Sequence, residues 1–259
     1  MQVITCDLPR SLTSIELHPF ADDHIGDPFC NEKLIKTRIE HVKNTPNAFI
    51  GLGGDIVNNA ITSSVSDTYT EKLSPMQQIN RAVELYYPVK DRILYAVMGN
   101  HCYRSYKSDG IDLMAIIAKE LGIYERYSDT AAFIFLRLGT LSREQSRNRR
   151  VVYRIYATHG SGGGKRIGGK ANRVEDLKGI VDADIYIHAH THQPLVFTES
   201  TYRAHNNTSS VELVTQTFVN TAGALDYGGY ASRAGYQPAN STNPIIMLSG
   251  TGKNVRVII

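Results

Sequence analysis

The sequence contains no tryptophan and only three cysteines among its 259 residues. Cys6, Cys30 and Cys102 are odd in number, far apart and without Cys-x-x-Cys spacing, which argues against a disulfide framework or a thiolate zinc site. No run of about 18 apolar residues occurs, as a spanning helix requires, and no basic segment followed by an apolar one begins the chain. We therefore expect a cytoplasmic protein in a reducing compartment, without a membrane partner.

An excess of charge of one sign is also absent. The formal net charge is +3, and 20% of the residues are charged, so composition neither requires nor excludes a polyanionic partner. With 42% hydrophobic residues, the chain can build a substantial core. It contains no internal repeat and no evident linker, and we expect one domain over residues 1–259.

Short β-type runs recur along the chain, and each ends in polar or glycine-rich residues. Five of them are SIELHPF before Asp22, AFIGLG before Asp55, RILYAVM before Gly99, YRIYAT before His159 and ADIYIHA before His190. Ser74, Pro75 and Gln77 predict a helix start, and Pro88 ends that helix. Further predicted helices cover 32–45, 111–121 and 173–180, and further predicted strands cover 132–138, 194–198, 211–219, 244–249 and 254–258. The pattern predicts an α/β fold with two packed mixed sheets flanked by helices.

The segment SREQSRNRR at 142–150 is polar and basic. We expect it to be the solvated loop of a hairpin. The alternative is a nucleic-acid contact through Arg143, Arg147, Arg149 and Arg150.

The polar residues at the strand ends form a set of oxygen and nitrogen donors. Ligands of open α/β sheets collect at the carboxyl ends of strands. Singly, each residue has a simpler role available: Asp22 can cap a helix, Asn100 can occupy a turn, and His159 can be an ordinary loop residue. Together, without any cysteine, they suit Mn, Fe, Zn or Co and exceed what one ion needs. The set comprises Asp22, His24, Asp55, Asn100, His101, His159, His190 and His192.

The segment IYIHAHTHQP at 185–194 places three histidines at alternate positions. In an extended segment, His188, His190 and His192 would share one face. Such a face invites a metal, whereas the simpler interpretation is an edge strand whose histidines face water.

In their order, the motifs DDH at Asp22, GGD at Asp55, GNH at Asn100, the isolated His159 and HAHTH at His190 resemble the signature of the calcineurin-like metallophosphoesterases. The resemblance implies a four-layer α/β/β/α sandwich and two divalent transition-metal ions, with Mn preferred over Fe, Zn or Co. The glycine-rich segment after His159 and the segment 219–238 also look like the phosphoesterases encoded by phages and prophages.

The resemblance assigns a role to each motif residue. It places Asp22, His24 and His192 at one metal and Asn100, His159 and His190 at the other, with Asp55 bridging them. In this family a hydroxide that bridges the metals attacks phosphorus, and His101 would be the catalytic residue that protonates the leaving oxygen. His188 has no family role and is expected in the core or behind a ligand.

Three positions depart from the family pattern. Ala189 replaces a common glycine, which matters only if the backbone there needs a positive φ. Cys102 follows His101 where an acidic residue is usual. Asn58 stands where phosphoprotein phosphatases have an aspartate that supports the catalytic histidine, so His101 is expected to lack a supporting carboxylate.

The loop GSGGGKRIGG fails the P-loop pattern, because His159 and Arg166 occupy key positions. We expect Lys165, Arg166 and Lys170 to bind substrate phosphate, the alternative being a plain surface loop. Tyr227, Tyr230 and Tyr236 are candidates for base stacking or for packing.

The leading hypothesis is a dinuclear metal-dependent hydrolase of phosphate esters, specifically a phosphodiesterase acting on nucleotides or nucleic acid. Two alternatives remain. One is a phosphomonoesterase, including a protein phosphatase, although the GDxVDRG pattern of that class is missing. The other is a non-catalytic scaffold with the same fold.

Overall fold

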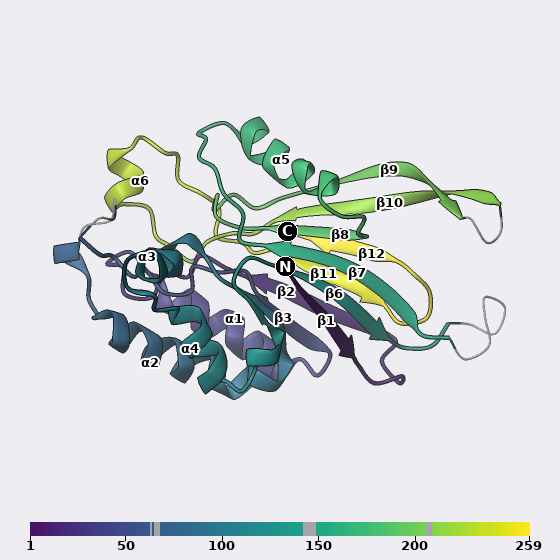
Figure 1. Ribbon diagram of the computed structural model, residues 1–259, viewed down its shortest axis with the longest axis horizontal. Coiled ribbons are helices and arrows are strands. Elements are labelled where there is room, and N and C mark those ends of the chain that lie inside the picture. Colours follow the sequence, from purple (N-terminus) through teal and green to yellow (C-terminus); the bar gives the residue numbers. More distant parts are fainter. Residues whose placement is uncertain (63, 65–67, 142–148, 206–208) are drawn as a thin grey trace.

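The computed structural model describes residues 1–62, 64, 68–141, 149–205 and 209–259. Two six-stranded mixed sheets pack face to face, as Figure 1 shows. The first sheet has the order β1-β6-β7-β8-β10-β9 and contains β1 (Gln2–Asp7), β6 (Ala131–Leu138), β7 (Val151–Thr158), β8 (Ile185–His188), β9 (Leu195–His205) and β10 (Ser210–Asn220). The second sheet has the order β12-β11-β2-β3-β4-β5 and contains β2 (Ser14–Phe20), β3 (Ala48–Leu52), β4 (Ile93–Val97), β5 (Tyr127–Ser128), β11 (Ile245–Ser249) and β12 (Val255–Ile258).

Helices cover the outer faces of both sheets (Figure 1). The α-helices are α1 (Glu32–Asn44), α2 (Pro75–Tyr86), α3 (Asn100–Asp109), α4 (Leu113–Glu120), α5 (Ile167–Glu175) and α6 (Gly229–Arg233). The 3₁₀ helices are η1 (Thr68–Thr70), η2 (Tyr87–Arg92), η3 (Tyr124–Arg126) and η4 (Asp176–Gly179). The helices α1, α2 and α4 lie against the second sheet, and α5 lies against the first.

Three apolar clusters correspond to the three interfaces between these four layers. One joins α1, α2 and α4 to the second sheet through residues such as Ile39, Leu52 and Ile117. The central cluster lies between the sheets and includes Leu17 and Ile155. The third joins the first sheet to α5 and η4, with Val174, Leu177 and Phe218. The predicted α/β fold with two mixed sheets between layers of helices is confirmed.

The local signals in the sequence explain most element boundaries. Ser74 and Gln77 form the predicted capping box of α2, and Asn31 and Asp112 cap α1 and α4 through their side chains. The helix predicted over 173–180 was given a start that is too late, because α5 already begins at Ile167. Its early glycines lower helix propensity, which packing of the helix against the first sheet overrides.

Other elements were missed or shortened. The edge strand β1 was not predicted, and β9 runs to His205 instead of ending at residue 198. The predicted loop at 142–150, with Arg143 and Arg147, lies outside the described residues except at its end. There Arg150 forms an ion pair with Asp7 (Nη1 to Oδ1, 2.6 Å), so this arginine is engaged within the protein.

Candidate metal centre

The predicted site residues meet at the carboxyl ends of parallel strands from both sheets. Asp22 and His24 follow β2, Asp55 follows β3, and Asn100 begins α3 just after β4. His159 follows β7, and His190 and His192 follow β8. Because β2, β3 and β4 are mutually parallel, as are β7 and β8, their ends form common edges where ligands can collect.

The first group, here named the Asp22 cluster, comprises Asp22, His24 and His192. Asp22 Oδ1 lies 3.3 Å from His192 Nε2 and 3.9 Å from His24 Nε2. The two imidazole nitrogens are 3.2 Å apart. Asp22 is fully buried, yet its Oδ1 atom has no hydrogen-bond partner among the residues that the structure describes. A buried carboxylate oxygen that faces two ring nitrogens is a suitable ligand for a cation.

The second group, the Asp55 cluster, comprises Asp55, Asn100, His159 and His190. His159 Nε2 is its central atom, 3.0 Å from Asp55 Oδ2 and 2.9 Å from Asn100 Oδ1. His190 Nδ1 lies 3.2 Å from the same nitrogen. The ligand atoms of Asp55, His159 and His190 all lie within 4.8 Å of one another.

Asp55 and His24 connect the two clusters. Their ligand atoms and that of His101 also lie within 4.8 Å of one another. Asp55 Oδ2 is 3.8 Å from His101 Nε2, and Asp55 Oδ1 accepts a 2.8 Å hydrogen bond from the His101 backbone N–H. The carboxylate of Asp55 therefore stands between the donors of both clusters.

The backbone is strained at this centre. Five of its residues have positive φ angles, from 47° to 63°, a region that residues other than glycine seldom adopt. They are Asp22, His24, Asp55, His190 and His192. Such strain concentrates at functional sites, where surrounding structure holds the conformation.

The same strain corrects the expectation that three histidines share a strand face. The strand β8 ends at His188, and the left-handed backbone at His190 and His192 turns those rings into different clusters. His188 is buried, and its Nδ1 lies 2.7 Å from Asn220 Oδ1. It is therefore held within the protein, as expected from its lack of a family role.

Close backbone packing brings Asp55 into place. A Cβ atom at Gly99 would lie 2.0 Å from Asp55 Oδ1, and one at Gly54 would lie 2.8 Å from the Gly99 backbone. Gly54 also has a φ of +91°. Only glycine allows these two loops to approach so closely.

The donor set fits divalent cations. His159 Nδ1 donates to Gly53 O at 2.9 Å, which leaves Nε2 as the atom that faces Asp55, Asn100 and His190. Burial disfavours a charged ring, but Asp55, Asp22 and the Gly53 carbonyl group together outweigh burial and raise the pKa of His159 to about 9. The centre thus attracts positive charge, and its oxygen and imidazole donors suit transition metals such as Mn, Fe, Zn and Co.

His101 has partners that the sequence did not reveal. Its Nδ1 donates to the Asn58 backbone carbonyl at 2.5 Å, and its Nε2 accepts from Arg104 Nη2 at 2.9 Å. Burial first, and then the Arg104 charge, lower the pKa of His101, while Asp55 acts in the opposite direction. Arg104, one helical turn beyond His101 on α3, was missed because no motif includes it. The spacing could have indicated it, because side chains three residues apart on a helix are neighbours.

The side chain of Asn58 supports His24 instead of His101. Its Oδ1 lies 3.1 Å from His24 Nδ1, and its amide group donates to Glu71. Glu71 also accepts from Gln78 Nε2 at 2.5 Å. The carboxylate behind Asn58 is Glu71 and it serves His24, whereas the ring of His101 bonds the Asn58 carbonyl group and Arg104.

The other two departures prove structurally mild. Cys102 is fully buried in the cluster between the helices and the second sheet, so α3 uses this position for packing. Ala189 has no positive φ, and its methyl group is therefore accommodated without strain.

The tentative substrate residues lie in and after the loop that follows His159. Lys165 Nζ stands 5.9 Å from the ring centroid of Tyr236, and Arg166 is the N-cap residue of α5. Tyr236 also packs beside Tyr230. Within the described residues, no hydrogen bond or ion pair joins Lys165, Arg166 or Lys170 to the Asp22 or Asp55 cluster.

Residues 23–194 match the family model of the calcineurin-like phosphoesterases, so the chain belongs to this family. This range contains every predicted metal ligand except Asp22, which directly precedes it. A search of curated proteins finds no match. No helix in the described part of the chain is long and apolar enough to cross a membrane.

Several solved structures are distantly similar to this chain. A predicted phosphoesterase from Streptococcus pneumoniae TIGR4 has 12% identity and a TM-score of 0.38, covering 96% of this chain and 91% of that one. Vps29 from Entamoeba histolytica, complexed with zinc, has 10% identity and a TM-score of 0.39, with coverages of 94% and 97%. The nuclease MPE from Pseudomonas putida has 10% identity and a TM-score of 0.34, with coverages of 93% and 87%.

Proposed function

We propose that this protein is a phosphodiesterase that uses two divalent transition-metal ions, with manganese preferred, and acts on nucleotides or nucleic acid. The observation that carries the proposal is the position of the Asp55 carboxylate between two sets of donors. The Asp22 cluster would hold one ion, the Asp55 cluster the other, and Asp55 would contact both. Bound there, the ions would neutralise charge on the phosphate and lower the pKa of water.

The residues beside the centre would act on the substrate directly. His101 would be the general acid: once Arg104 turns to the substrate phosphate and Nε2 is protonated, it would give that proton to the leaving oxygen. Arg104 Nη2, 2.9 Å from that nitrogen, would bind the non-bridging phosphate oxygens and stabilise their negative charge in the transition state. Burial and the Arg104 charge both favour the neutral form of His101, whereas the Asp55 carboxylate favours the protonated form that a general acid needs.

The substrate beyond the scissile phosphate would lie along the loop after His159. Lys165, Arg166 and Lys170 would bind further phosphates. The exposed rings of Tyr227 and Tyr230, with the half-buried Tyr236 beside Tyr230, would be available to stack on a base. This placement favours a nucleotide or nucleic acid over a small monoester. The likeness of this segment to phage-encoded phosphoesterases and the cytoplasmic location stay predictions.

The test compares hydrolysis of bis-(p-nitrophenyl) phosphate with that of p-nitrophenyl phosphate in the presence of Mn²⁺. Wild type is compared with Asp55→Asn and with Asp7→Asn, a control that replaces an exposed aspartate. We expect preferential diester cleavage that Asp55→Asn abolishes and Asp7→Asn retains. Preference for the monoester would favour the phosphomonoesterase alternative. Inactivity of a protein that holds both ions would favour the scaffold.

A further inference from the structure

A further group of side chains with the donor atoms of metal ligands, apart from the Asp22 and Asp55 clusters, lies on the outer face of the second sheet. Glu16 and His18 are two residues apart on β2, so their side chains share a face. His41, in the last turn of α1, completes the group. His18 lies four residues before Asp22 in the chain, more than about 10 Å along an extended strand, so the group is separate from the Asp22 cluster.

The distances within this group fit a shared cation. His18 Nε2 lies 3.1 Å and His41 Nε2 lies 2.9 Å from the same atom, Glu16 Oε2. The centroids of the two rings are 5.1 Å apart. Ligand atoms bound to tetrahedral zinc at 2.0–2.1 Å are about 3.3 Å from one another. An ion therefore requires each histidine nitrogen to move only a few tenths of an ångström from Glu16 Oε2, and the three ligand atoms all lie within 4.8 Å of one another.

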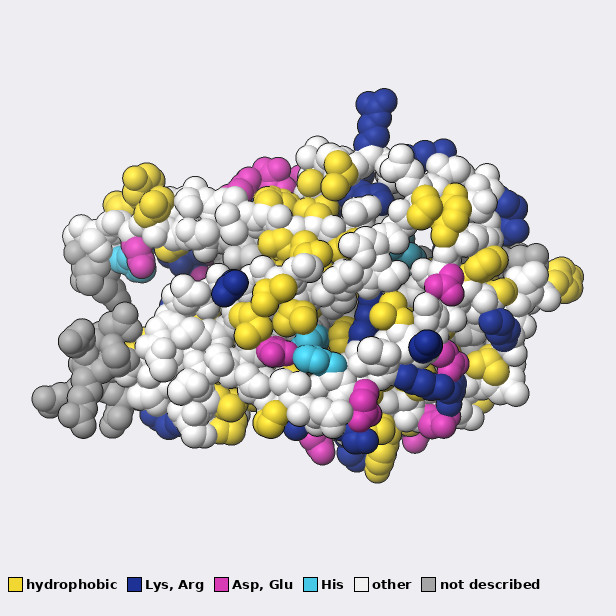
Figure 2. Space-filling view, turned by 180° about the vertical axis from the view of Figure 1, so that it is seen from behind, with side chains coloured by type: hydrophobic (Ala, Val, Ile, Leu, Met, Phe, Trp, Pro, Cys, Tyr) yellow, Lys and Arg dark blue, Asp and Glu magenta, His cyan; other side chains and the backbone are white. Residues whose placement is uncertain are grey.

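The group is open on one side. The side chain of His18 is 5% exposed, that of Glu16 20% and that of His41 47%. Figure 2 shows that, on the molecule seen from behind, histidine lies beside an acidic side chain at the surface. Two imidazoles, one carboxylate and an open position for water form a zinc-type ligand set.

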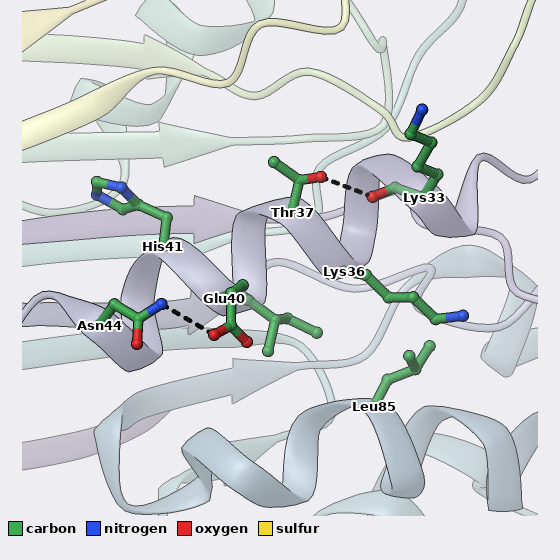
Figure 3. Close-up of a pocket in the computed structure, with 8 residues that line it drawn as sticks. Lys33, Lys36, Thr37, Glu40, His41, Asn44 and Leu85 are labelled. Carbon is green, nitrogen blue, oxygen red and sulfur yellow. Dashed lines mark hydrogen bonds between the residues drawn. The ribbon is translucent and has the colours of Figure 1, made fainter.

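The surroundings favour positive charge. His41 lies at the carboxyl end of α1, where the helix dipole is negative. Figure 3 shows its ring directed away from Leu85, although His41 is one of the residues that line the groove between α1 and α2. Arg38, one turn earlier on α1, directs its Nη2 group to the carbonyl groups of Gly223 and Ser241, but its charge still acts on His18, where it opposes further positive charge.

We infer that Glu16, His18 and His41 form a third metal site, which binds a divalent transition-metal ion of the zinc type. The ion would connect β2 to the last turn of α1 and stabilise the folded state, because it binds ligands that only folding brings together. This site is independent of the proposed phosphodiesterase activity.

Zinc titration calorimetry on the full chain tests the inference. The background variant Asp22→Asn/Asp55→Asn weakens the catalytic centre, and His41→Gln is then added to it. The control addition is His205→Gln, which removes a histidine that pairs with a single carboxylate, Glu212, at 2.9 Å. Replacing a residue that only supports a metal ligand lowers metal affinity about 10–100-fold. His41 is proposed as a ligand itself, so we expect His41→Gln to weaken Zn²⁺ binding at one site by at least about tenfold. We expect no change with His205→Gln.

Zinc content of the otherwise unmodified protein provides a second measurement. We expect one ion fewer in His41→Gln than in wild type, with phosphodiesterase activity unchanged. Equal zinc content and equal titration curves with and without His41 would overturn the inference. Loss of activity in Asp55→Asn bears only on the proposed function, so the two proposals fail separately.

Discussion

Asn58 Oδ1 accepts a hydrogen bond from His24 Nδ1 at 3.1 Å. The orientation of this amide is determined by Glu71, because the Asn58 nitrogen donates to that carboxylate and its oxygen must then face His24. His24 consequently carries its proton on Nδ1 and presents Nε2, without a proton, to the Asp22 cluster. Partners behind a ligand set its tautomer and orientation in this way.

Glu71→Gln should weaken metal binding. The new amide places an N–H group where the Asn58 or Gln78 amide now donates, so one of these contacts becomes repulsive. We expect Mn²⁺ affinity to fall about tenfold, measured by titration calorimetry. Glu84→Gln, an exposed partner of Arg81, is the control. Equal affinities of the two variants would exclude this role for Glu71.

Arg104→Met should reduce catalysis while leaving the ions in place. The guanidinium group lies beside His101 but is not a member of either cluster. Loss of one charged donor to a transition state costs about 10²-fold in kcat, and we expect a fall of this size for the diester. Lys107→Met on the same helix is the control. Unchanged kinetics, or a fall explained by lost metal, would contradict the assignment.

Gly99→Ala should disrupt the Asp55 cluster. The added Cβ would lie 2.0 Å from Asp55 Oδ1, so the carboxylate or the loop must move. We expect loss of bound Mn²⁺ and a fall in activity of about 10²-fold or more, since misplacement by about 1 Å has such an effect. Gly168→Ala, where the Cβ meets no atom within 4 Å, should retain both properties.

Asp184 should make stability depend on pH. Burial tends to raise the pKa of Asp184, but hydrogen bonds from Arg154 and Lys253 outweigh it and lower that pKa. Its stabilising contribution is present above the unfolded-state pKa of about 3.9 and is lost as pH falls through the lower folded-state value.

Asp184→Asn should therefore lower the free energy of unfolding at pH 7 by about 1–3 kcal/mol. The difference from wild type should shrink below about pH 4, as measured by urea unfolding between pH 7 and pH 3. A difference that is constant over this range would show that the ionised carboxylate contributes nothing.

The fold and the residues of the site were largely predictable from sequence, because each depends on short-range patterns. Short runs of apolar and β-branched residues predict strands such as β6 and β10, and polar residues directly after strands predict where ligands meet. The capping box at Ser74 gives the start of α2 correctly.

The errors arose where tertiary contacts decide the conformation. The backbone at His190 and His192 is left-handed instead of extended, so a face assigned from alternation was wrong. Glu71 lies 13 residues beyond Asn58 and reaches it only through folding. Arg104 contacts His101 through one helical turn, but α3 itself was not predicted.

Anomalous diffraction from crystals grown with Mn²⁺ tests the central claim most directly. The account predicts two peaks at the carboxyl ends of the strands. One should lie among Asp22 Oδ1, His24 Nε2 and His192 Nε2, the other among Asn100 Oδ1, His159 Nε2 and His190 Nδ1, with Asp55 in contact with both. A single peak at saturating Mn²⁺, or two peaks without Asp55 between them, would contradict a dinuclear centre.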